Sequence, residues 1–393
     1  MKMIVQLKEL GSIITGNTPS KKEHLYWDSE DISFVKPDTI SDDYLTLISE
    51  SKEKISLAAK SKARIVPKDA ILVTCIGIVG KIGIAECDVA FNQQINAIIT
   101  NEKVLPKYLA YALLNSKTRL SEIANAPVVP IINKSQFSGF KIKIEDSILV
   151  QNKVVQQLDK VTAIINARKH ELQTLDDLVK ARFVEMFGDP TINPFKWKIV
   201  NITEVINGKV SNGFFAKRDD YSNSGNVAVL GVAYVVNRMY SQIDNLPKTN
   251  ATNKEIDKFS LKYGDMLFCR SSLVAEGIGK ASIVPEKTPE NVLFECHVIR
   301  IPLDTEKCVP EFMQVLSTTD YFRNQIIAQS KTATMTTIGQ DGILKSNIIL
   351  PPMSIQKEFY RFVKEVDKSK VVVQKALDEA QLLFDSLMQQ YFG

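Results

Sequence analysis

Residues 147–188 read SILVQNKVVQQLDKVTAIINARKHELQTLDDLVKARFVEMFG. Apolar side chains recur here at alternating steps of four and three residues, which keeps them on one side of an α-helix, as in a coiled coil. The same ladder returns about 205 residues later, in residues 353–393. At about 1.5 Å per residue each helix would be roughly 50–60 Å long, so we expect the two to pair with each other. The predicted apolar seam comprises Val154, Leu158, Val161, Ile165, Leu172, Leu175, Val179, Phe359, Val363, Val366, Val373, Leu377 and Phe384.

The duplication extends well beyond the two ladders. Matching segments follow one another in the same order in both halves, and the offset between them grows steadily, which indicates a duplicated domain. Within these segments we expect Asp69 to correspond to Asp265. The matches are 68–72 with 263–268, Gly80-Lys81 with Gly279-Lys280, 105–109 with 309–313, and Arg119 with Arg323.

The pattern predicts an α/β (α+β) fold with pseudo-two-fold internal duplication. Short apolar runs at 70–75, 82–85, 266–269 and 281–284 are typical of strands. Two globular domains would be separated by the two long coiled-coil helices. The helices must be antiparallel, because a parallel pair would place both globular domains at the same end. The predicted boundaries are 1–146 and 189–352 for the globular domains, and 147–188 and 353–393 for the helices.

The composition is that of an ordinary globular protein. The 393 residues include 49 Lys and Arg against 45 Asp and Glu, and this net charge of +4 permits nucleic-acid binding through local patches without requiring it. The longest uncharged apolar stretch, 70–80, is too short to span a bilayer. Charged residues also come too early for a secretory signal. We therefore expect a cytoplasmic protein with no membrane contact.

Recognisable catalytic motifs are absent from the sequence. It has no phosphate-binding loop and no dinucleotide-binding glycine motif. The five cysteines form no Cys-x-x-Cys pair and there are three histidines, so we expect no metal site. Cys296-His297 is interpreted as a partly buried pair within a strand. Asn193-Pro194-Phe195 is similar to the motif with which amino-methyltransferases grip a flipped base, but it has one proline and no cofactor-binding motif accompanies it. We expect neither catalytic residues nor a bound cofactor.

Several motifs resemble those of the DNA-specificity (S) subunit of type I restriction–modification systems, over essentially the whole chain. The stretch 14–22 is similar to that family's Gly-Gly-Thr-Pro-Ser loop, and Tyr26-Trp27 follows it. Residues 264–268 resemble its Gly-Asp-Ile-Leu strand, and 350–356 resemble the Leu-Pro-Pro start of its long helix. Two departures stand out: Asn17 replaces a glycine of the first loop, and the corresponding stretch 207–215 has no Thr-Pro.

The resemblance implies a function and a set of partners. Each globular domain would be a target-recognition domain that enters a DNA major groove and reads one half of an asymmetric, bipartite target. The helices would fix the unread spacer between the half-sites. Two copies of a modification subunit would carry S-adenosylmethionine and methylate adenine N6 after flipping it, and a restriction subunit would use ATP and Mg²⁺.

Loop residues with hydrogen-bonding side chains are the candidates for DNA contacts. Lys and Arg suit guanine edges and Asn and Gln suit adenine. Alternatives remain open for each group: Lys21-Lys22 as a solvated turn, the stretch 92–96 as partners of buried backbone, and Arg270 in a salt bridge within the core. The candidates are Thr18, Ser20, Lys21, Lys22, Asn92 and Gln93 in the first domain, and Lys217, Arg218, Arg270 and Ser271 in the second.

Two other functions compete with this interpretation. The chain could be a non-enzymatic scaffold that binds polypeptides through its coiled coil and does not bind DNA. It could also be the specificity segment of a fused methyltransferase, although 393 residues leave no room for a catalytic domain.

Overall fold

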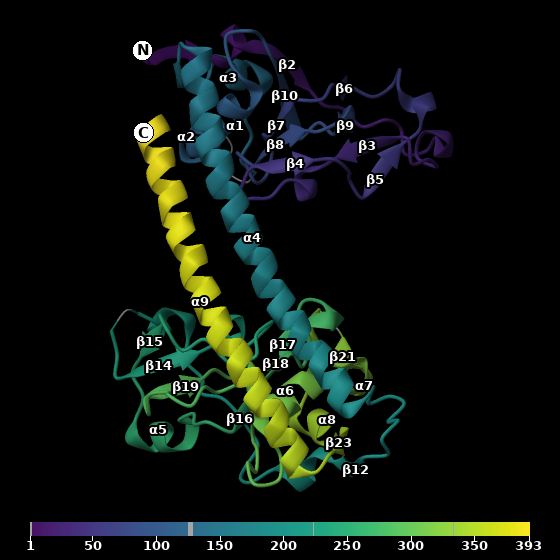
Figure 1. Ribbon diagram of the computed structural model, residues 1–393, viewed down its shortest axis with the longest axis vertical. Coiled ribbons are helices and arrows are strands. Elements are labelled where there is room, and N and C mark those ends of the chain that lie inside the picture. Colours follow the sequence, from purple (N-terminus) through teal and green to yellow (C-terminus); the bar gives the residue numbers. More distant parts are fainter. Residues whose placement is uncertain (1, 125–128, 223, 333) are drawn as a thin grey trace. The chain divides into compact units, whose positions relative to one another are not determined.

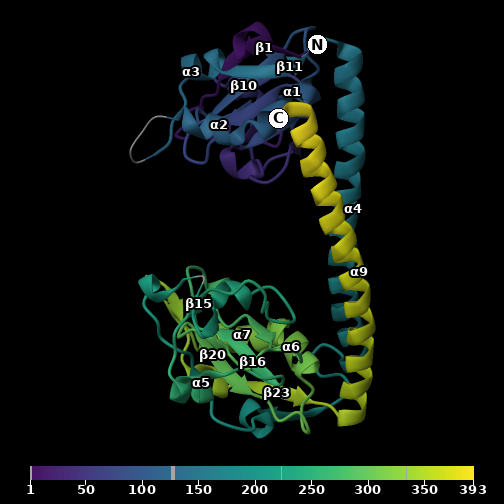
Figure 2. The ribbon, with the colours of Figure 1, turned by 90° about the vertical axis from the view of Figure 1, so that its left-hand side faces the viewer.

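The computed structural model describes residues 2–124, 129–222, 224–332 and 334–393. Its longest elements are helices α4 (Ile148–Phe187) and α9 (Met353–Phe392), each of 40 residues. They lie side by side and run in opposite directions (Figure 1, Figure 2). Helix α4 ends where Gly188 takes a positive φ of 75° and its N–H bonds the carbonyl of Val184.

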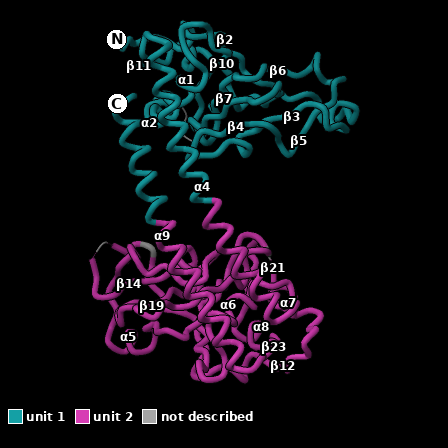
Figure 3. The backbone as a smooth tube through the Cα atoms, in the orientation of Figure 1, with its two compact units in different colours: residues 1–169, 375–393 teal, residues 170–374 magenta. Residues whose placement is uncertain are grey.

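The chain divides into two compact units, and each contains half of both long helices (Figure 3). Unit 1 comprises residues 1–169 and 375–393, and unit 2 comprises residues 170–374. In unit 2, Asp176 pairs with Lys370, and Arg182, farther along α4, lies 3.4 Å from Glu358, which is earlier in α9. Rising numbers in one helix therefore meet falling numbers in the other, which is an antiparallel arrangement.

The residues of the predicted seam are all buried or half-buried. Lys370 interrupts the apolar series, and its ion pair with Asp176 compensates its charge. Leu172, Leu175, Leu377 and Phe384 are half-buried. The buried seam residues are Val154, Leu158, Val161, Ile165, Val179, Phe359, Val363, Val366 and Val373.

Unit 1 places short helices against mixed sheets. One sheet has the order β2-β10-β7-β8-β4, a second has the order β5-β3-β9-β6, and β1 pairs with β11. Helix α1 (Pro106–Asn115) buries six consecutive side chains, 108–113, and is followed by α2 (Lys117–Glu122) and α3 (Lys134–Gly139). The strands are β1 (Lys2–Gln6), β2 (Gly11–Thr15), β3 (Ile32–Val35), β4 (Thr46–Ile48), β5 (Glu53–Ile55), β6 (Ile65–Val66), β7 (Ile71–Thr74), β8 (Ile82–Ala85), β9 (Val89–Phe91), β10 (Ile95–Thr100) and β11 (Lys141–Glu145).

Unit 2 repeats this plan. The order β13-β20-β16-β18 corresponds to β2-β10-β7-β8, and β14 pairs in parallel with β19 as β3 does with β9. The helices are α5 (Asn253–Phe259), α6 (Pro310–Thr318), α7 (Asp320–Ala328) and α8 (Gln340–Leu344). The strands are β12 (Lys198–Asn201), β13 (Ser211–Asn212), β14 (Val227–Leu230), β15 (Lys248–Thr249), β16 (Asp265–Cys269), β17 (Ser271–Ser272), β18 (Ala281–Ile283), β19 (Val292–Phe294), β20 (Val298–Pro302), β21 (Lys331–Thr332), β22 (Thr336–Thr337) and β23 (Asn347–Leu350). The predicted α/β class, internal duplication and antiparallel helices are confirmed.

A buried glutamine fastens each long helix to its globular domain in the same way. Oε1 of Gln151, in the first turn of α4, accepts a hydrogen bond from the N–H of Leu105 at 2.8 Å. Oε1 of Gln356, in the first turn of α9, accepts one from the N–H of Val309 at 2.9 Å. Both glutamine side chains are fully buried, and both donors directly precede the proline that begins α1 or α6. The duplication therefore extends to individual hydrogen bonds.

Replacing Gln356 with Leu is expected to destabilise unit 2. The substitution leaves the buried N–H of Val309 and the carbonyl of Pro351, which the Gln356 amide contacts at 2.7 Å, without partners. At about 1–3 kcal/mol for each of the two unsatisfied groups, the free energy of unfolding should fall by roughly 2–6 kcal/mol. Denaturant unfolding measures this change. The exposed Gln389→Leu variant on the same helix is the control, and an equal loss in both variants would contradict the proposed bond.

Two residue correspondences expected from the sequence are wrong. Asp69 and Gly264 both have positive φ. The carbonyls of Ala70 and Asp265 accept equivalent bonds from the N–H groups of Ala85 and Val284, so Asp69 corresponds to Gly264 and not to Asp265. The Arg119 guanidinium bonds the carbonyl that opens β11, and the Gln325 amide bonds the carbonyl that opens β23. Gln325, rather than Arg323, therefore plays the part of Arg119.

Candidate nucleic-acid interface

The loop that follows β2 is held closely against the turn between β9 and β10. The N–H of Gly16 bonds the carbonyl of Ile95 at 3.1 Å, and that of Asn17 bonds Phe91 at 3.0 Å. A Cβ on Gly16 would lie 2.1 Å from the carbonyl oxygen of Asn92, so no larger residue fits there. The Asn17 side chain closes the loop from the other side, through the carbonyl of Lys62 and the N–H of Arg64.

This approach brings two of the predicted contact residues together. The Thr18 hydroxyl donates to Oε1 of Gln93 at 2.7 Å, and both side chains are exposed. The Gln93 amide nitrogen remains available as a donor and the Thr18 oxygen as an acceptor. An exposed pair of this kind can present both hydrogen-bonding functions to a base edge.

Lys21 is positioned by its neighbours, although its side chain is 63% exposed. Its ammonium lies 5.4 Å from the Trp27 ring centroid and 3.7 Å from the Glu53 carboxylate. The Trp27 ring is in turn fixed by a bond from its N–H to the carbonyl of Ser20. Lys22 and the Ser20 side chain are exposed on the same loop.

Asn92 is buried, with 6% of its surface exposed. Its side chain accepts from the N–H of Gln94 and donates to the Gln94 side chain. Asn92 therefore serves the turn itself, which matches the alternative in which these residues satisfy buried groups. A base contact by Asn92 has no support in this geometry.

Unit 2 repeats the backbone arrangement of the first loop with different side chains. The N–H of Gly213 bonds Val298, that of Phe214 bonds Phe294, and a Cβ on Gly213 would lie 2.1 Å from the Phe294 oxygen. Gly213 therefore corresponds to Gly16. The Thr-Pro sequence is missing from this copy, but the close approach that it accompanies in unit 1 is retained.

Arg270 and Ser271 lie beside the turn that precedes β20. The Arg270 guanidinium donates to the carbonyl of Cys296 at 3.3 Å, and Oγ of Ser271 lies 2.8 Å from Nδ1 of His297. Arg270 is half-exposed and makes no salt bridge within the described residues, contrary to the alternative of a core ion pair. His297 is exposed and lies before the strand, not within it as the sequence suggested.

The two units carry different chemistry at the same backbone position. The N–H of Arg270 bonds the carbonyl of His297, as that of Cys75 bonds Gln94, so Arg270 takes the place of Cys75. Cys75 is 2% exposed, and burial raises the pKa of its thiol to about 11, so it stays neutral. A half-exposed guanidinium in one unit thus replaces a buried neutral thiol in the other.

The remaining predicted residues lie on a neighbouring loop of unit 2. Lys217 is exposed, and its backbone N–H bonds the Asp220 carboxylate at 2.9 Å. The side chain of Arg218 lies outside the described part of the chain. The exposed residues Lys331 and Thr332 of β21 are not among the residues predicted from the sequence. Strand β21 joins β22 and β17 in a small sheet next to Arg270.

No group of three or more His, Cys, Asp or Glu in the described ranges is arranged to hold a metal ion. None of the described helices has the length and apolar character needed to cross a bilayer.

Comparison with known proteins shows similarity along the whole chain. The family of the type I restriction modification DNA specificity domain matches twice, over residues 2–175 and 194–380. The type I restriction enzyme MjaIX specificity subunit of Methanocaldococcus jannaschii is 23% identical, with 98% of this chain and 91% of the relative covered. The EcoKI specificity subunit of Escherichia coli K12 is 22% identical, with 98% and 86% covered. The crystal structure of an S subunit from M. genitalium superimposes with a TM-score of 0.57 at 11% identity, covering 100% of this chain and 96% of that one.

Proposed function

Because the chain belongs to the family of type I restriction modification DNA specificity domains, we propose that each globular domain reads one half of an asymmetric, bipartite DNA target. DNA sequence recognition is the general role of specificity subunits. Under this proposal partner subunits methylate adenine N6 and cleave DNA, and the chain itself has no catalytic role.

One observation carries the proposal of two different half-sites. The backbone that holds Thr18 and Gln93 in unit 1 recurs in unit 2 at Phe215 and Cys296, and Arg270 beside it replaces Cys75, so the side chains differ in charge and hydrogen-bonding pattern. A guanidinium suits the O6 and N7 acceptors of guanine, whereas an amide with a hydroxyl offers both donors and acceptors. Two copies of one scaffold with unlike side chains would read unlike sequences.

Replacing Arg270 with Ala is expected to relax recognition at one base pair of one half-site. One N–H of the Arg270 guanidinium donates to the carbonyl of Cys296, and its other N–H groups are available to donate to a base. Losing a good base contact costs about 1–3 kcal/mol, so discrimination at that position should fall by roughly 10–100-fold. Methylome sequencing of cells that express the chain with its modification subunit measures this. The Lys254→Ala variant, which removes an exposed charge from α5, is the control. Unchanged discrimination at every position would exclude Arg270 as a base contact.

The long helices support the proposed protein partners. Large apolar side chains are exposed along α4, among them Ile164 at 49% and Val184 at 53%, and along α9, among them Val372 at 70% and Leu382 at 69%. Exposed apolar groups on otherwise polar helices favour a protein interface. We assign these faces to two copies of a modification subunit with S-adenosylmethionine, which a restriction subunit with ATP and Mg²⁺ would join. A cytoplasmic location belongs to the same proposal.

A gel shift with duplex DNA separates this function from the coiled-coil scaffold. The complex with the modification subunit should bind duplex DNA that carries its methylated sequence more tightly than duplex DNA in which one half is scrambled. Equal binding to both duplexes, or no binding, would favour the scaffold.

A further inference from the structure

A cavity of about 500 Å³ in unit 2 has five cationic side chains and one acidic side chain in its lining. It lies between the second half of α4, Lys370 of α9 and the surface formed by α6, α7 and residues 237–239. The charged residues that line it are Asp176, Lys180, Arg238, Lys280, Arg323 and Lys370. Its size is in the range of small-ligand sites.

Three of these cations have neutral partners. Lys280 donates to the Asn237 side chain at 2.7 Å, Arg238 to the Gln242 side chain at 2.7 Å, and Arg323 to the carbonyl of Glu276 at 3.1 Å. None of the three forms an ion pair with an acidic residue of the described ranges. Lys180 and Lys370, in contrast, pair with Asp177 and Asp176. The cavity therefore holds roughly three uncompensated positive charges.

Arg323 also has a nitrogen with no partner. Its Nη1 is buried and makes no hydrogen bond in the described structure. Burial lowers the pKa of this guanidinium, which means that the surroundings disfavour its charged form. An unsatisfied donor on a buried cation is costly unless an acceptor completes it.

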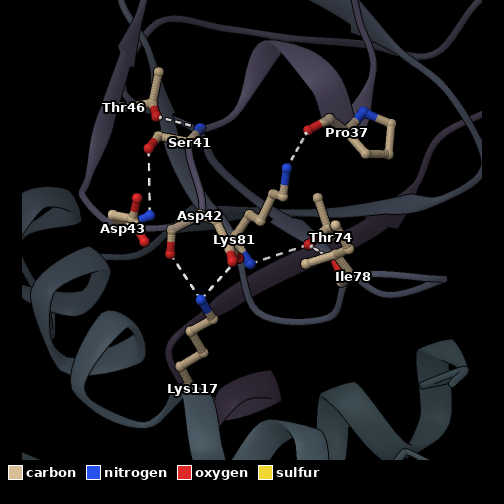
Figure 4. A network of polar contacts seen from close by, with 9 residues as sticks. All are labelled: Pro37, Ser41, Asp42, Asp43, Thr46, Thr74, Ile78, Lys81 and Lys117. Atoms are coloured by element: carbon tan, nitrogen blue, oxygen red, sulfur yellow. Dashed lines mark hydrogen bonds and ion pairs between the residues drawn. The ribbon is translucent and has the colours of Figure 1, made fainter. Parts of the chain in front are cut away.

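Unit 1 shows how the equivalent basic pair is neutralised (Figure 4). Lys81 corresponds to Lys280, and Lys117 lies beside Gly80 as Arg323 lies near Gly279. Lys81 donates to the carbonyl of Pro37 at 3.1 Å. Lys117 donates to the Asp42 carboxylate at 2.7 Å. The segment after β3 thus supplies an anion to this place, whereas the segment after β14 supplies the amide Asn237.

Large side chains occupy the volume beside the basic pair in unit 1, whereas the equivalent volume in unit 2 is the cavity. Leu105 and Val309 are equivalent, because the N–H of each donates to a buried glutamine. The same distance along the chain from them pairs Tyr111 with Val315 and Leu114 with Thr318. In the helix ladder Phe384 corresponds to Val179. The Tyr111 and Phe384 rings pack 6.2 Å apart in unit 1. Smaller residues at these positions in unit 2 leave the cavity beside the basic pair.

We propose that this cavity is an anion site that takes the phosphate groups of a small ligand in the place that Asp42 fills in unit 1. One carboxylate would leave most of the charge uncompensated, whereas a phosphate or pyrophosphate carries several negative charges and several acceptor oxygens. Lys280, Arg238 and Arg323, which line the cavity, provide cationic donors to these oxygens.

Isothermal titration of the full chain with sodium pyrophosphate at low salt tests the site. We expect one saturable site per chain. Asn237→Asp supplies the carboxylate internally, at a positive φ of 61° that Asp also tolerates, and should weaken binding at least about tenfold. Arg323→Gln should weaken it to a similar extent. Thr318→Leu fills the cavity with the residue of unit 1 without changing charge, and it should also weaken binding.

The control is Lys117→Gln, which removes a comparable charge from unit 1, where Lys117 already pairs with Asp42, and it should leave binding unchanged. Asn237 and Thr318 are exposed, so their variants should fold even if the Arg323 variant does not. No saturable binding by the wild-type chain, or an equal loss in the Lys117 control, would overturn the proposal. A second titration in the presence of random duplex DNA distinguishes the sources of phosphate. Binding that is independent of DNA supports a small phosphate ligand, whereas displacement by DNA would overturn the small-ligand proposal in favour of a nucleic-acid backbone.

Discussion

Replacing residues 1–146 with the corresponding domain of a relative should change one half of the methylated sequence and leave the other half intact. Methylation at the original site should be lost, because both halves are required together. The physical reason is that each globular domain has its own copy of the loop that we propose contacts DNA, at Gly16 in one and Gly213 in the other. Methylome sequencing reads the old and new targets directly.

The joint between domain and helix favours such an exchange. Gln151 contacts a backbone N–H of the first domain, that of Leu105, and a backbone group is present whatever the side chain. A grafted domain therefore keeps this bond. The reciprocal exchange of residues 189–352 is the matched control and should alter the opposite half. If either exchange changed both halves together, the proposal of two independent readers would be wrong.

Removing residues 375–393 should destabilise unit 1 much more than any single substitution. This segment supplies the Phe392 ring, 5.2 Å from that of Tyr108, and the Phe384 ring, 6.2 Å from that of Tyr111. It also supplies Met388, which is 6% exposed in the same core. Loss of a buried aromatic side chain alone costs about 3–5 kcal/mol.

Limited proteolysis with fragment mapping measures this loss separately for each unit. We expect rapid cleavage within residues 1–169 of the truncated chain and slower cleavage within 170–374, since unit 2 contains none of the removed residues. The Phe384→Ala variant should show a smaller effect in the same unit. Uniform cleavage of both units, or no change in either, would contradict the assignment of the last residues to the core of unit 1.

The architecture was predictable because its signals are periodic. A seam such as Val154, Leu158 and Val161 repeats over many turns, so a few exceptions do not hide it. The strand expected at 70–75 rests on a short apolar run, and the structure confirms it as β7 (Ile71–Thr74). The resemblance to S subunits, stated from ordered motifs, is confirmed by the family match along both halves.

The details of the candidate interface depend on geometry that the sequence does not display. Asn92 and Gln93 are adjacent polar residues, yet one is buried within a turn and the other is exposed, because the backbone turns between them. The sequence does not reveal Gly213 as the counterpart of Gly16, because their equivalence lies in backbone hydrogen bonds and close approach and not in neighbouring side chains. The sequence pairs Asp69 with Asp265 because both are aspartates, whereas the positive φ that Asp69 shares with Gly264 shows that these two residues correspond. The chemical contrast between Cys75 and Arg270 became visible only after this backbone alignment.

The division of the chain into units has a consequence for its synthesis. Unit 2 is continuous, from residue 170 to residue 374, whereas unit 1 joins residues 1–169 to residues 375–393. At about 5–20 residues per second, a ribosome that has finished residue 169 needs roughly 10–40 s to deliver the segment that covers Tyr108 and Tyr111. During that time the first domain has an unfinished apolar surface, and the second can already close its core. The domain that is made first is therefore the last to be completed, and the nascent chain has the greatest need of chaperone protection at its N-terminal end.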